Sequence, residues 1–178
     1  MRNFLIKQTK HPFVLMLDAD MLPDKDNFLS EYRQQITSEQ KIICGGYSYK
    51  KRILQGREYD FYFYKGQKTE EISAKERNKT PWRYLFTGNV LVHRDVLNTI
   101  GFDENFVHYG YEDIEWGIRL SSHYPIHHLD NTCSHLGLVQ KDKAFVRMRS
   151  SIPNFLRLKA LHPGLFSKTG AAKISRVF

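Results

Sequence analysis

The sequence has 178 residues, of which 41% are hydrophobic and 13% aromatic, which is typical of one globular domain and excludes a disordered chain. The longest apolar run has five residues, far below the ~20 that a membrane-spanning helix needs, and the first ten residues lack the apolar stretch of a secretory signal. We therefore expect a cytoplasmic protein whose two cysteines, Cys44 and Cys133, are reduced thiols.

The net charge of +8 belongs to the C-terminal part of the chain. Residues 1–140 carry 18 basic and 18 acidic side chains, whereas residues 141–178 carry nine basic ones and a single acid. Such a basic tail binds anionic lipid, nucleic acid or nothing in particular. Because the rest of the chain is neutral, we expect no nucleic acid as the main partner and allow peripheral contact with an anionic membrane.

The first half of the chain shows two strand patterns around a helix. Residues 13–17 (FVLML) predict a buried strand that ends at two carboxylates, and a helix is expected from Asp24 or Asp26 to about Ile36. Residues 41–49 predict a second buried strand, in which two adjacent glycines mark a bulge or a close backbone approach. The charged stretch 65–79 is typical of a mobile surface excursion.

The second half continues the alternation of strands and helices. Residues 84–106 predict a strand, a Gly-Asn kink, a strand to His93, a short helix and a stop at Gly101. A helix is expected over 112–124, a histidine-rich β segment over 125–137, and an amphipathic helix over 142–161 that is interrupted near its proline. The pattern predicts an α/β fold with a layered sheet, in which ligands bind beyond the carboxyl ends of the strands.

The stretch Asp18-Ala19-Asp20 follows directly after the first strand. Residues i and i+2 of an extended segment point the same way, so both carboxylates can converge on one ligand. Oxygen ligands of this kind suit Mg²⁺ or Mn²⁺. An Asp-rich turn, with each carboxylate capping local amides, accounts for the same residues without a metal.

Two further groups of residues can carry chemistry. Glu112 and Asp113 open a predicted helix, where the dipole and the free amides stabilise carboxylates, and such a group can act as a general base or simply as a cap. Among the late histidines, His135 stands in a β-like segment, and an imidazole added to a pair of aspartates favours Mn²⁺ over Mg²⁺. The other histidines are expected to be surface or packing residues.

These pieces occur in a familiar order: LDAD, TGNVLVHRDVLNTIGFDENF, YGYEDIEWGIRL and HHLDNTCSHLG. The order resembles glycosyltransferase family 2 enzymes of the GT-A fold. The second half is similar to the C-terminal part of β-galactosyltransferases and of chondroitin-type polymerases. The resemblance covers roughly residues 1–160, and the combination of motifs is specific although each motif alone is weak. It implies a GT-A-type mixed sheet flanked by helices.

The resemblance also implies a role for individual residues. Asp20 would bind the metal, Asp18 would reach the metal or the donor ribose, and His135 would complete the metal shell. Asp113 would be the catalytic base, with Glu112 beside it on the acceptor sugar. The sugar site would be lined by three further residues: Gly88, Asn89 and Tyr111. A plain turn would need the same Gly-Asn pair.

The expected activity is inverting, metal-dependent transfer of a sugar from a nucleotide-sugar, with a UDP-linked donor favoured by family habit. The acceptor would be a saccharide or a lipid-linked saccharide, in the synthesis of polysaccharide or glycoconjugate. Residues 1–161 would form the catalytic domain and 162–178 a basic tail, working on the cytoplasmic face of the plasma membrane.

Two departures from the family pattern affect this expectation. The GGED of galactosyltransferase-like enzymes is GYED here, which leaves the sugar preference open. The opening MRN resembles a motif normally found well inside the domain, so the first two nucleotide-binding βα units are expected to be absent and the fold truncated at its N-terminus. An inactive remnant that serves only as a binding module is therefore the alternative function. Metal-dependent phosphoryl hydrolysis also fits clustered Asp and His, although the order of the motifs argues against it.

Overall fold

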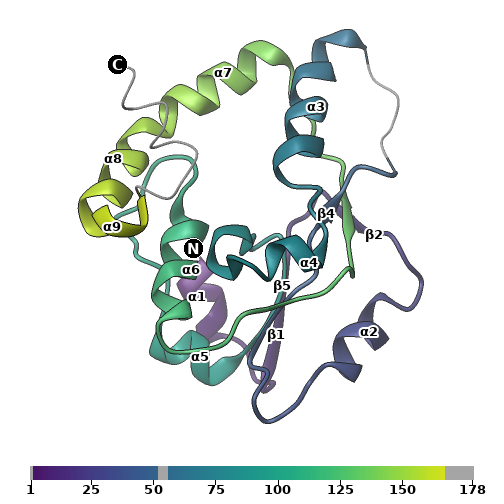
Figure 1. The fold of residues 1–178 in the computed structure, drawn as a ribbon, viewed down its shortest axis with the longest axis vertical. Coiled ribbons are helices and arrows are strands. Elements are labelled where there is room, and N and C mark those ends of the chain that lie inside the picture. The colour runs from purple at the N-terminus through teal and green to yellow at the C-terminus, as the bar shows by residue number, and fades with distance from the viewer. Residues whose placement is uncertain (1, 52–55, 167–178) are drawn as a thin grey trace.

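The computed structural model describes residues 2–51 and 56–166, which form two small sheets with helices around them (Figure 1). The first sheet has the order β1-β5-β3-β6, formed by Phe13–Leu17, Asn89–His93, Ile42–Cys44 and His127–His128. The second has the order β2-β7-β4, formed by Met21–Pro23, Cys133–His135 and Tyr47–Ser48. Each sheet contains one parallel pair, β3 with β6 and β4 with β7, beside antiparallel pairs. The predicted α/β fold with mixed sheets flanked by helices is confirmed.

The helices follow the chain around these sheets. In chain order the α-helices are α1 (Arg2–Lys7), α2 (Phe28–Gln34), α3 (Asp60–Thr69), α4 (Ala74–Arg77), α5 (Arg94–Thr99), α6 (Glu112–Ser121), α7 (Lys141–Ser150), α8 (Ile152–Leu161) and α9 (Pro163–Phe166). Short 3₁₀ turns span Arg57–Tyr59 and Pro81–Tyr84. No helix in the described part of the chain has the length and apolar character needed to cross a membrane.

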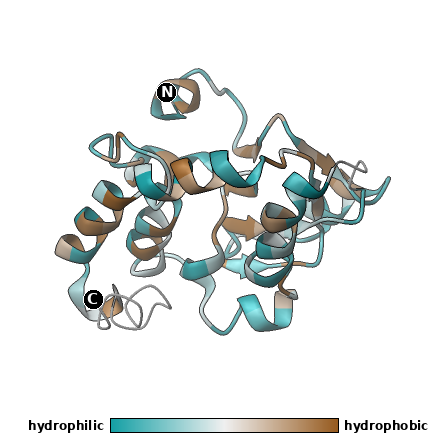
Figure 2. Cartoon of the chain, turned by 90° about the horizontal axis from the view of Figure 1, so that it is seen from above, coloured by the Kyte–Doolittle hydropathy of each residue, from teal (hydrophilic) through white to brown (hydrophobic). Residues whose placement is uncertain are grey.

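The strand β3 joins two hydrophobic clusters through its two faces. Ile42 and Cys44 belong to the cluster around Trp116, whereas Ile43 belongs to the cluster that contains Phe28 and Tyr32. Alternate side chains of a strand point to opposite faces, so a three-residue strand serves both clusters. The apolar colouring of the central strands in Figure 2 agrees with this position. The two clusters hold the first strand, and hence its two aspartates, in place.

The stretch 41–49 is two strands and not one. It passes from the first sheet to the second at Gly45-Gly46, where Gly46 has φ +83°. The predicted close approach at the glycines is confirmed, because a Cβ at Gly45 would overlap the Asn131 carbonyl and the Tyr32 hydroxyl. Periodicity could not reveal the switch, since both strands are buried and read as one apolar run.

The prediction of a mobile excursion over 65–79 is wrong. The stretch contains the end of α3 and the whole of α4, and Arg77 is completely buried. Its guanidinium donates to the carbonyls of Ile72, Gly45 and Leu129, at 2.9, 3.3 and 2.6 Å. A charged run predicts a solvated loop, but Arg77 is buried because three carbonyls of irregular backbone accept its hydrogen bonds.

Several helix predictions are confirmed, with shifted ends. The helix α5 ends two residues before Gly101, α6 begins at Glu112, and the C-terminal helix is divided at Ser151. The helix α2 begins later than expected because its cap position is Asn27, and Asp24 instead accepts hydrogen bonds from Ser48, Thr132 and Ser134. Cys44 and Cys133 are free and buried, as predicted. Most of the predicted basic tail, residues 167–178, lies outside the described residues.

Candidate active site

A cavity of about 380 Å³ lies between the two sheets' strand ends and the start of α6. Five of the residues that the sequence singled out border it together. They are Asp18, Asp20, Glu112, Asp113 and His135. Tyr111 also lines the cavity, with Tyr47, Tyr62, Tyr109 and three charged residues, Arg2, Glu70 and Arg147. Acids separated by almost a hundred residues in the chain therefore face one space.

The turn after β1 and the end of β7 bring Asp20 to His135. The strands β2 and β7 pair with Met21 opposite His135, and the Leu136 amide donates to the Asp20 carbonyl at 2.8 Å. His135 Nε2 lies 3.6 Å from Asp20 Oδ2. A Cβ at Gly137 would overlap that same carboxylate oxygen, so a side chain there would displace the Asp20 carboxylate from its place beside His135. The register of one antiparallel pair thus places an imidazole beside a carboxylate.

Glu70 stands behind His135, on the side away from Asp20. Its Oε2 lies 3.7 Å from His135 Nδ1 and accepts a hydrogen bond from the Tyr49 hydroxyl at 2.5 Å. Burial acts to raise the pKa of the Glu70 carboxyl, but the adjacent His135 imidazole and the hydrogen bond from Tyr49 outweigh it and hold this pKa below its usual value. Burial lowers the pKa of His135, and Glu70 and Asp20 more than compensate, so the net shift is upward. A carboxylate in this place fixes which ring nitrogen faces the cavity.

The donors around Asp20 match a hard divalent ion in type. Carboxylate oxygens with one imidazole nitrogen suit Mn²⁺, and the Asp20–His135 separation is close to that of neighbouring ligands on one ion. Within residues 2–51 and 56–166, no three His, Cys, Asp or Glu side chains already stand close enough to hold an ion. The fit therefore rests on the Asp20–His135 pair, with Asp18 in the same cavity as a third donor group.

The acidic pair begins α6 after an unusual backbone turn. Gly110 and Tyr111 both have positive φ, +77° and +69°, and Tyr111 is the single non-glycine residue with positive φ in the described chain. A left-handed conformation is costly for a tyrosine and persists where the surroundings impose it. The turn directs the first residues of α6, Glu112 and Asp113, toward the cavity.

Asp113 is held by Thr87 and faces Arg2. The Thr87 amide and hydroxyl donate to its carboxylate at 3.0 and 2.9 Å, and Arg2 Nη1 lies 3.4 Å from Oδ1. Burial raises the pKa of Asp113 to about 6, the Arg2 charge opposes this shift, and the Glu112 charge adds to it. The side chain is 22% exposed, so it can still meet a ligand. A carboxylate with this pKa is largely ionised at neutral pH and basic enough to take a proton.

Glu112 has one engaged and one open oxygen. Its Oε1 accepts from Arg2 at 3.1 Å, while Oε2 is buried without a hydrogen-bond partner among the described residues. A buried carboxylate oxygen without a donor is costly. The open oxygen suits the hydroxyl of a bound ligand.

Gly88 and Asn89 do not line the cavity, although the sequence predicts both in the sugar site. Asn89 is 1% exposed, and its amide donates to the carbonyls of Gly46 and Asn131 and accepts from the Tyr32 hydroxyl. It therefore joins the two sheets in the core. A Cβ at Gly88 would overlap the Tyr47 hydroxyl and lie 2.7 Å from Asp18 Oδ2, so Gly88 leaves room for both groups.

Sequence reasoning assigned no site role to four residues that border or support the cavity: Arg2, Glu70, Thr87 and Arg147. Glu70 was hidden in the stretch that was interpreted as a surface excursion. Thr87 immediately precedes the Gly-Asn pair, and this proximity was the one available signal. Arg147 was counted only as part of the basic tail.

Comparisons with known proteins find similarity to two synthases. The chain is 27% identical to a chondroitin synthase of Pasteurella multocida (strain Pm70), and 26% identical to a hyaluronan synthase of Pasteurella multocida. Each alignment covers 67% of this chain and 15% of the synthase, so the chain corresponds to a small part of these relatives. No family model matches the chain. Membership of glycosyltransferase family 2 thus stays a prediction.

Proposed function

We propose that this chain carries out metal-dependent, inverting transfer of a sugar from a nucleotide-sugar, UDP-linked, to an acceptor in the synthesis of polysaccharide or glycoconjugate. The observation that carries the proposal is that Asp18, Asp20, Glu112, Asp113 and His135 border one cavity. The similarity to two synthases of saccharide polymers supports the same chemical class.

The roles follow from the position of each group in the cavity. Asp20 and His135 would hold Mn²⁺ or Mg²⁺ with Asp18 beside them, and Glu70 would keep the His135 ring in place. Such an ion, when bound, neutralises charge that develops on a diphosphate leaving group. Of the two hard ions, the imidazole favours Mn²⁺.

The acids of α6 would act on the acceptor. Asp113 takes the proton from the acceptor hydroxyl as that oxygen attacks the anomeric carbon on the face opposite the leaving nucleotide. The open Oε2 of Glu112 accepts a hydrogen bond from a second acceptor hydroxyl and so fixes the sugar's orientation. A single displacement inverts the anomeric configuration, and the free carboxylic acid of Asp113 then releases its proton to solvent.

The test is nucleotide release from a panel of UDP-sugars with Mn²⁺ and saccharide acceptors. We expect Asp113→Asn to lower the rate by about 10²–10⁴-fold, the usual contribution of a general base, with donor and Mn²⁺ binding nearly unchanged in calorimetry. Asp142→Asn, an exposed carboxylate on α7, is the matched control and keeps the wild-type rate. Loss of donor binding in Asp113→Asn would show that its role is misassigned. Binding of UDP-sugars without any release would favour the alternative, a binding module.

A further inference from the structure

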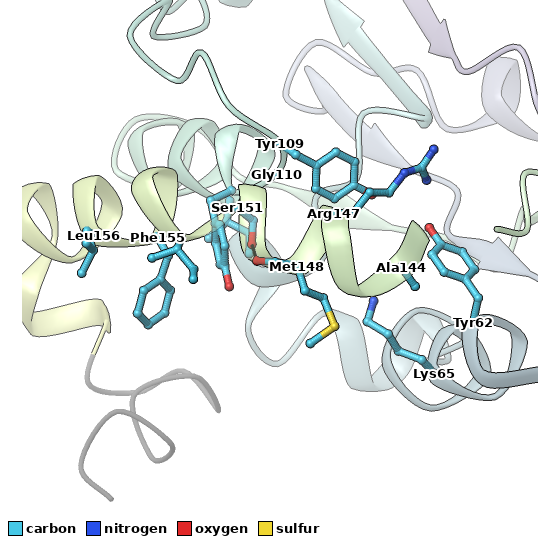
Figure 3. Close-up of a pocket in the computed structure, with 13 residues that line it drawn as sticks. Tyr62, Lys65, Tyr109, Gly110, Ala144, Arg147, Met148, Ser151, Phe155 and Leu156 are labelled. Carbon is cyan, nitrogen blue, oxygen red and sulfur yellow. Dashed lines mark hydrogen bonds between the residues drawn. The ribbon is translucent and has the colours of Figure 1, made fainter. Parts of the chain in front are cut away.

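A second, larger cavity opens beside the first, between α3 and the helices α7 and α8 (Figure 3). Its volume is about 700 Å³, within the usual range for small-molecule sites. Figure 3 shows Tyr62 and Lys65 of α3 opposite Ala144 and Met148 of α7, with Phe155 and Leu156 of α8 farther along. We call this cavity the α7–α8 groove. Of the residues given a role above, it is lined by Tyr111 alone.

The groove is continuous with the catalytic cavity. The residues shared by the two are Tyr62, Tyr109, Gly110, Tyr111, Ile114 and Arg147. Tyr111 and Ile114 flank the acidic pair that opens α6. A ligand that places a hydroxyl at Asp113 can therefore extend its far end into the groove.

The walls of the groove are apolar over most of their length. Met148, Ile152, Phe155 and Leu156 come from α7 and α8, and Ile114 forms part of the floor. The Ser151 hydroxyl already donates to the Met148 carbonyl at 2.8 Å. A saccharide chain needs many hydrogen-bonding partners, and this wall supplies few. A hydrocarbon chain needs none, and it gains free energy from every methylene that leaves water.

One cation stands where the groove meets the catalytic cavity. Arg147 borders both, and its guanidinium lies 5.4 Å from the centre of the Tyr109 ring. It is half-buried, and no carboxylate of the described residues lies within ion-pair distance of it. Lys65 lines the groove from α3, opposite Arg147's helix, but lies 4.0 Å from Glu70, so Arg147 is the cation that the described carboxylates leave unpaired at the junction. The junction thus has positive charge and planar donors, which match a phosphate.

We propose that the α7–α8 groove holds the hydrocarbon part of an acceptor in which the sugar is joined to a lipid through a phosphate group. The sugar hydroxyl lies at Asp113, the phosphate at Arg147, and the alkyl or isoprenoid chain in the groove. This order of base, cation and apolar wall follows the order of parts in such a molecule. The inference rests on the proposed function and narrows its acceptor from saccharides in general to phosphate-linked lipids.

The exposed surface around the groove fits the same occupant. Apolar side chains on α7 and α8 that remain exposed include Phe145, Val146, Met148, Ile152 and Leu156. Basic residues alternate with them, among them Lys141, Lys143, Arg149 and Arg157. Helices that combine an apolar row with basic residues lie at anionic lipid surfaces. The groove would therefore open where a lipid acceptor resides.

The experiment measures binding of octyl, decyl and dodecyl phosphate to the full chain by calorimetry, below their micelle-forming concentrations and without donor or metal. We expect each extension by two methylenes to tighten binding about tenfold. Inorganic phosphate and octyl glucoside, which lack one part of the ligand each, are expected to bind at least tenfold more weakly than octyl phosphate.

Two pairs of variants on α7, each with one residue inside the groove and one outside it, test whether the ligand binds in the groove. Met148→Glu and Arg147→Gln should each weaken dodecyl phosphate binding tenfold or more. Val146→Glu and Arg149→Gln alter an exposed apolar and a basic residue of the same helix outside the groove, and they should bind within twofold of the wild type. Circular dichroism verifies that all four variants fold. The proposal is overturned if Met148→Glu and Val146→Glu weaken dodecyl phosphate binding equally, or if Arg147→Gln and Arg149→Gln do so. It is also overturned if neither variant of a pair weakens binding.

A soluble saccharide acceptor supplies the decisive comparison. If a chondroitin or hyaluronan oligosaccharide binds the chain and Met148→Glu abolishes that binding while dodecyl phosphate is unaffected, the groove is a saccharide subsite and the proposal fails. Alkyl phosphate binding requires neither Asp113 nor a metal. It can therefore be lost while UDP-sugar turnover persists, or persist while turnover is absent, and the failure of this proposal is distinguishable from failure of the proposed function.

Discussion

Asp113 owes its character to neighbours with opposite effects. Burial raises the pKa of its carboxyl to about 6, and the positive charge of Arg2 holds that pKa below where burial alone would put it. As a base the group must be ionised, so the rate of transfer is expected to rise with pH through about 6 and then level off. Arg2 thus sets the pH at which the proposed base becomes available.

Arg2→Gln should move this acid limb to higher pH. Removing a cation 3.4 Å from the Asp113 carboxyl raises the carboxyl pKa by about one, so at pH 6 the variant should lose about tenfold activity relative to its own high-pH plateau, against about twofold for the wild type. Lys7→Gln, an exposed residue on the same helix, is the control and keeps the wild-type profile. The measurement is kcat/KM for nucleotide release from pH 5 to 9. A limb that stays in place in Arg2→Gln would exclude Asp113 as the titrating base.

Gly137 shows how one missing side chain permits the proposed metal pair. A methyl group there would overlap Asp20 Oδ2 and lie 3.1 Å from His135 Nε2. In Gly137→Ala the Asp20 carboxylate must rotate away, and we expect Mn²⁺ affinity to fall about tenfold, as for other changes around a metal's ligands. Because Asp20 is a flexible, half-exposed side chain, the free energy of unfolding should change by less than about 1 kcal/mol.

The control for this change is Gly164→Ala, at a position where an added Cβ comes within 4 Å of no described residue. Calorimetric titration with Mn²⁺ and urea unfolding, run on both variants, separate a local effect from a global one. Unchanged Mn²⁺ affinity in Gly137→Ala would remove Asp20 from the proposed metal site.

At the scale of single elements, α4 is the clearest case of a short segment with a large structural role. It has four residues, and its last one, Arg77, reaches the backbone of three other segments at Ile72, Gly45 and Leu129. Arg77 Nη1 also lies 3.1 Å from Nδ1 of the buried His128, which must accept this bond because arginine only donates. The guanidinium thus holds in place the Gly45-Gly46 segment, where the chain passes from the first sheet to the second.

We expect Arg77→Met to lower the free energy of unfolding by about 3–5 kcal/mol, because it leaves several buried acceptors without donors. Lys75→Met, an exposed residue of the same helix, should change it by less than about 0.5 kcal/mol. Urea denaturation followed by circular dichroism provides the comparison. A small loss in Arg77→Met would mean that the carbonyls find other donors and that α4 is not a fastening element.

The turn before α6 contains a strained backbone conformation at Tyr111 that orients the acidic pair at the start of the helix. Tyr111 adopts a left-handed backbone, its ring packs 5.5 Å from that of Phe155, and it lines both the cavity at the start of α6 and the α7–α8 groove. An ordinary helix start would turn Glu112 and Asp113 in another direction. Backbone outliers are concentrated at functional sites for this reason.

At the scale of the whole molecule, the two sheets are expected to unfold together. Cys44 lies in β3 of the first sheet and Cys133 in β7 of the second, and the cluster that contains Cys133 also includes Ile43 of β3. Burial raises the pKa of each thiol to about 12, so neither is reactive in the folded protein. The thiols therefore report on the opening of each sheet separately.

Pulsed alkylation across a guanidinium series, with peptide mapping of each cysteine, measures this directly. We expect no labelling without denaturant and coincident midpoints for Cys44 and Cys133, as for a cooperative single domain. Labelling of Cys133 at a clearly lower concentration would show that the second sheet opens alone. Arg77→Met, which removes the hydrogen bond to the Gly45 carbonyl where the chain changes sheets, should shift both midpoints equally.

The residue types and their order were enough to predict the α/β class, the strand before Asp18, the helix that begins at Glu112 and the β character of residues 125–137, within which the structure places β6 and β7. Each depends on local periodicity or on a charged helix start, which are properties of neighbouring residues. Local pattern misplaced the strand over 41–49 and the loop over 65–79. The switch of sheet at Gly45-Gly46 and the burial of Arg77 both depend on partners far along the chain.

The sequence by itself determined which acids and which histidine were candidates, because their chemistry and order are written in the chain. Only the tertiary structure decided that they share a cavity, that Asn89 supports the core instead of a ligand, and that Glu70 and Arg147 border the site. The physical reason is that strand register and helix packing bring together residues a hundred positions apart, and no local pattern encodes those contacts.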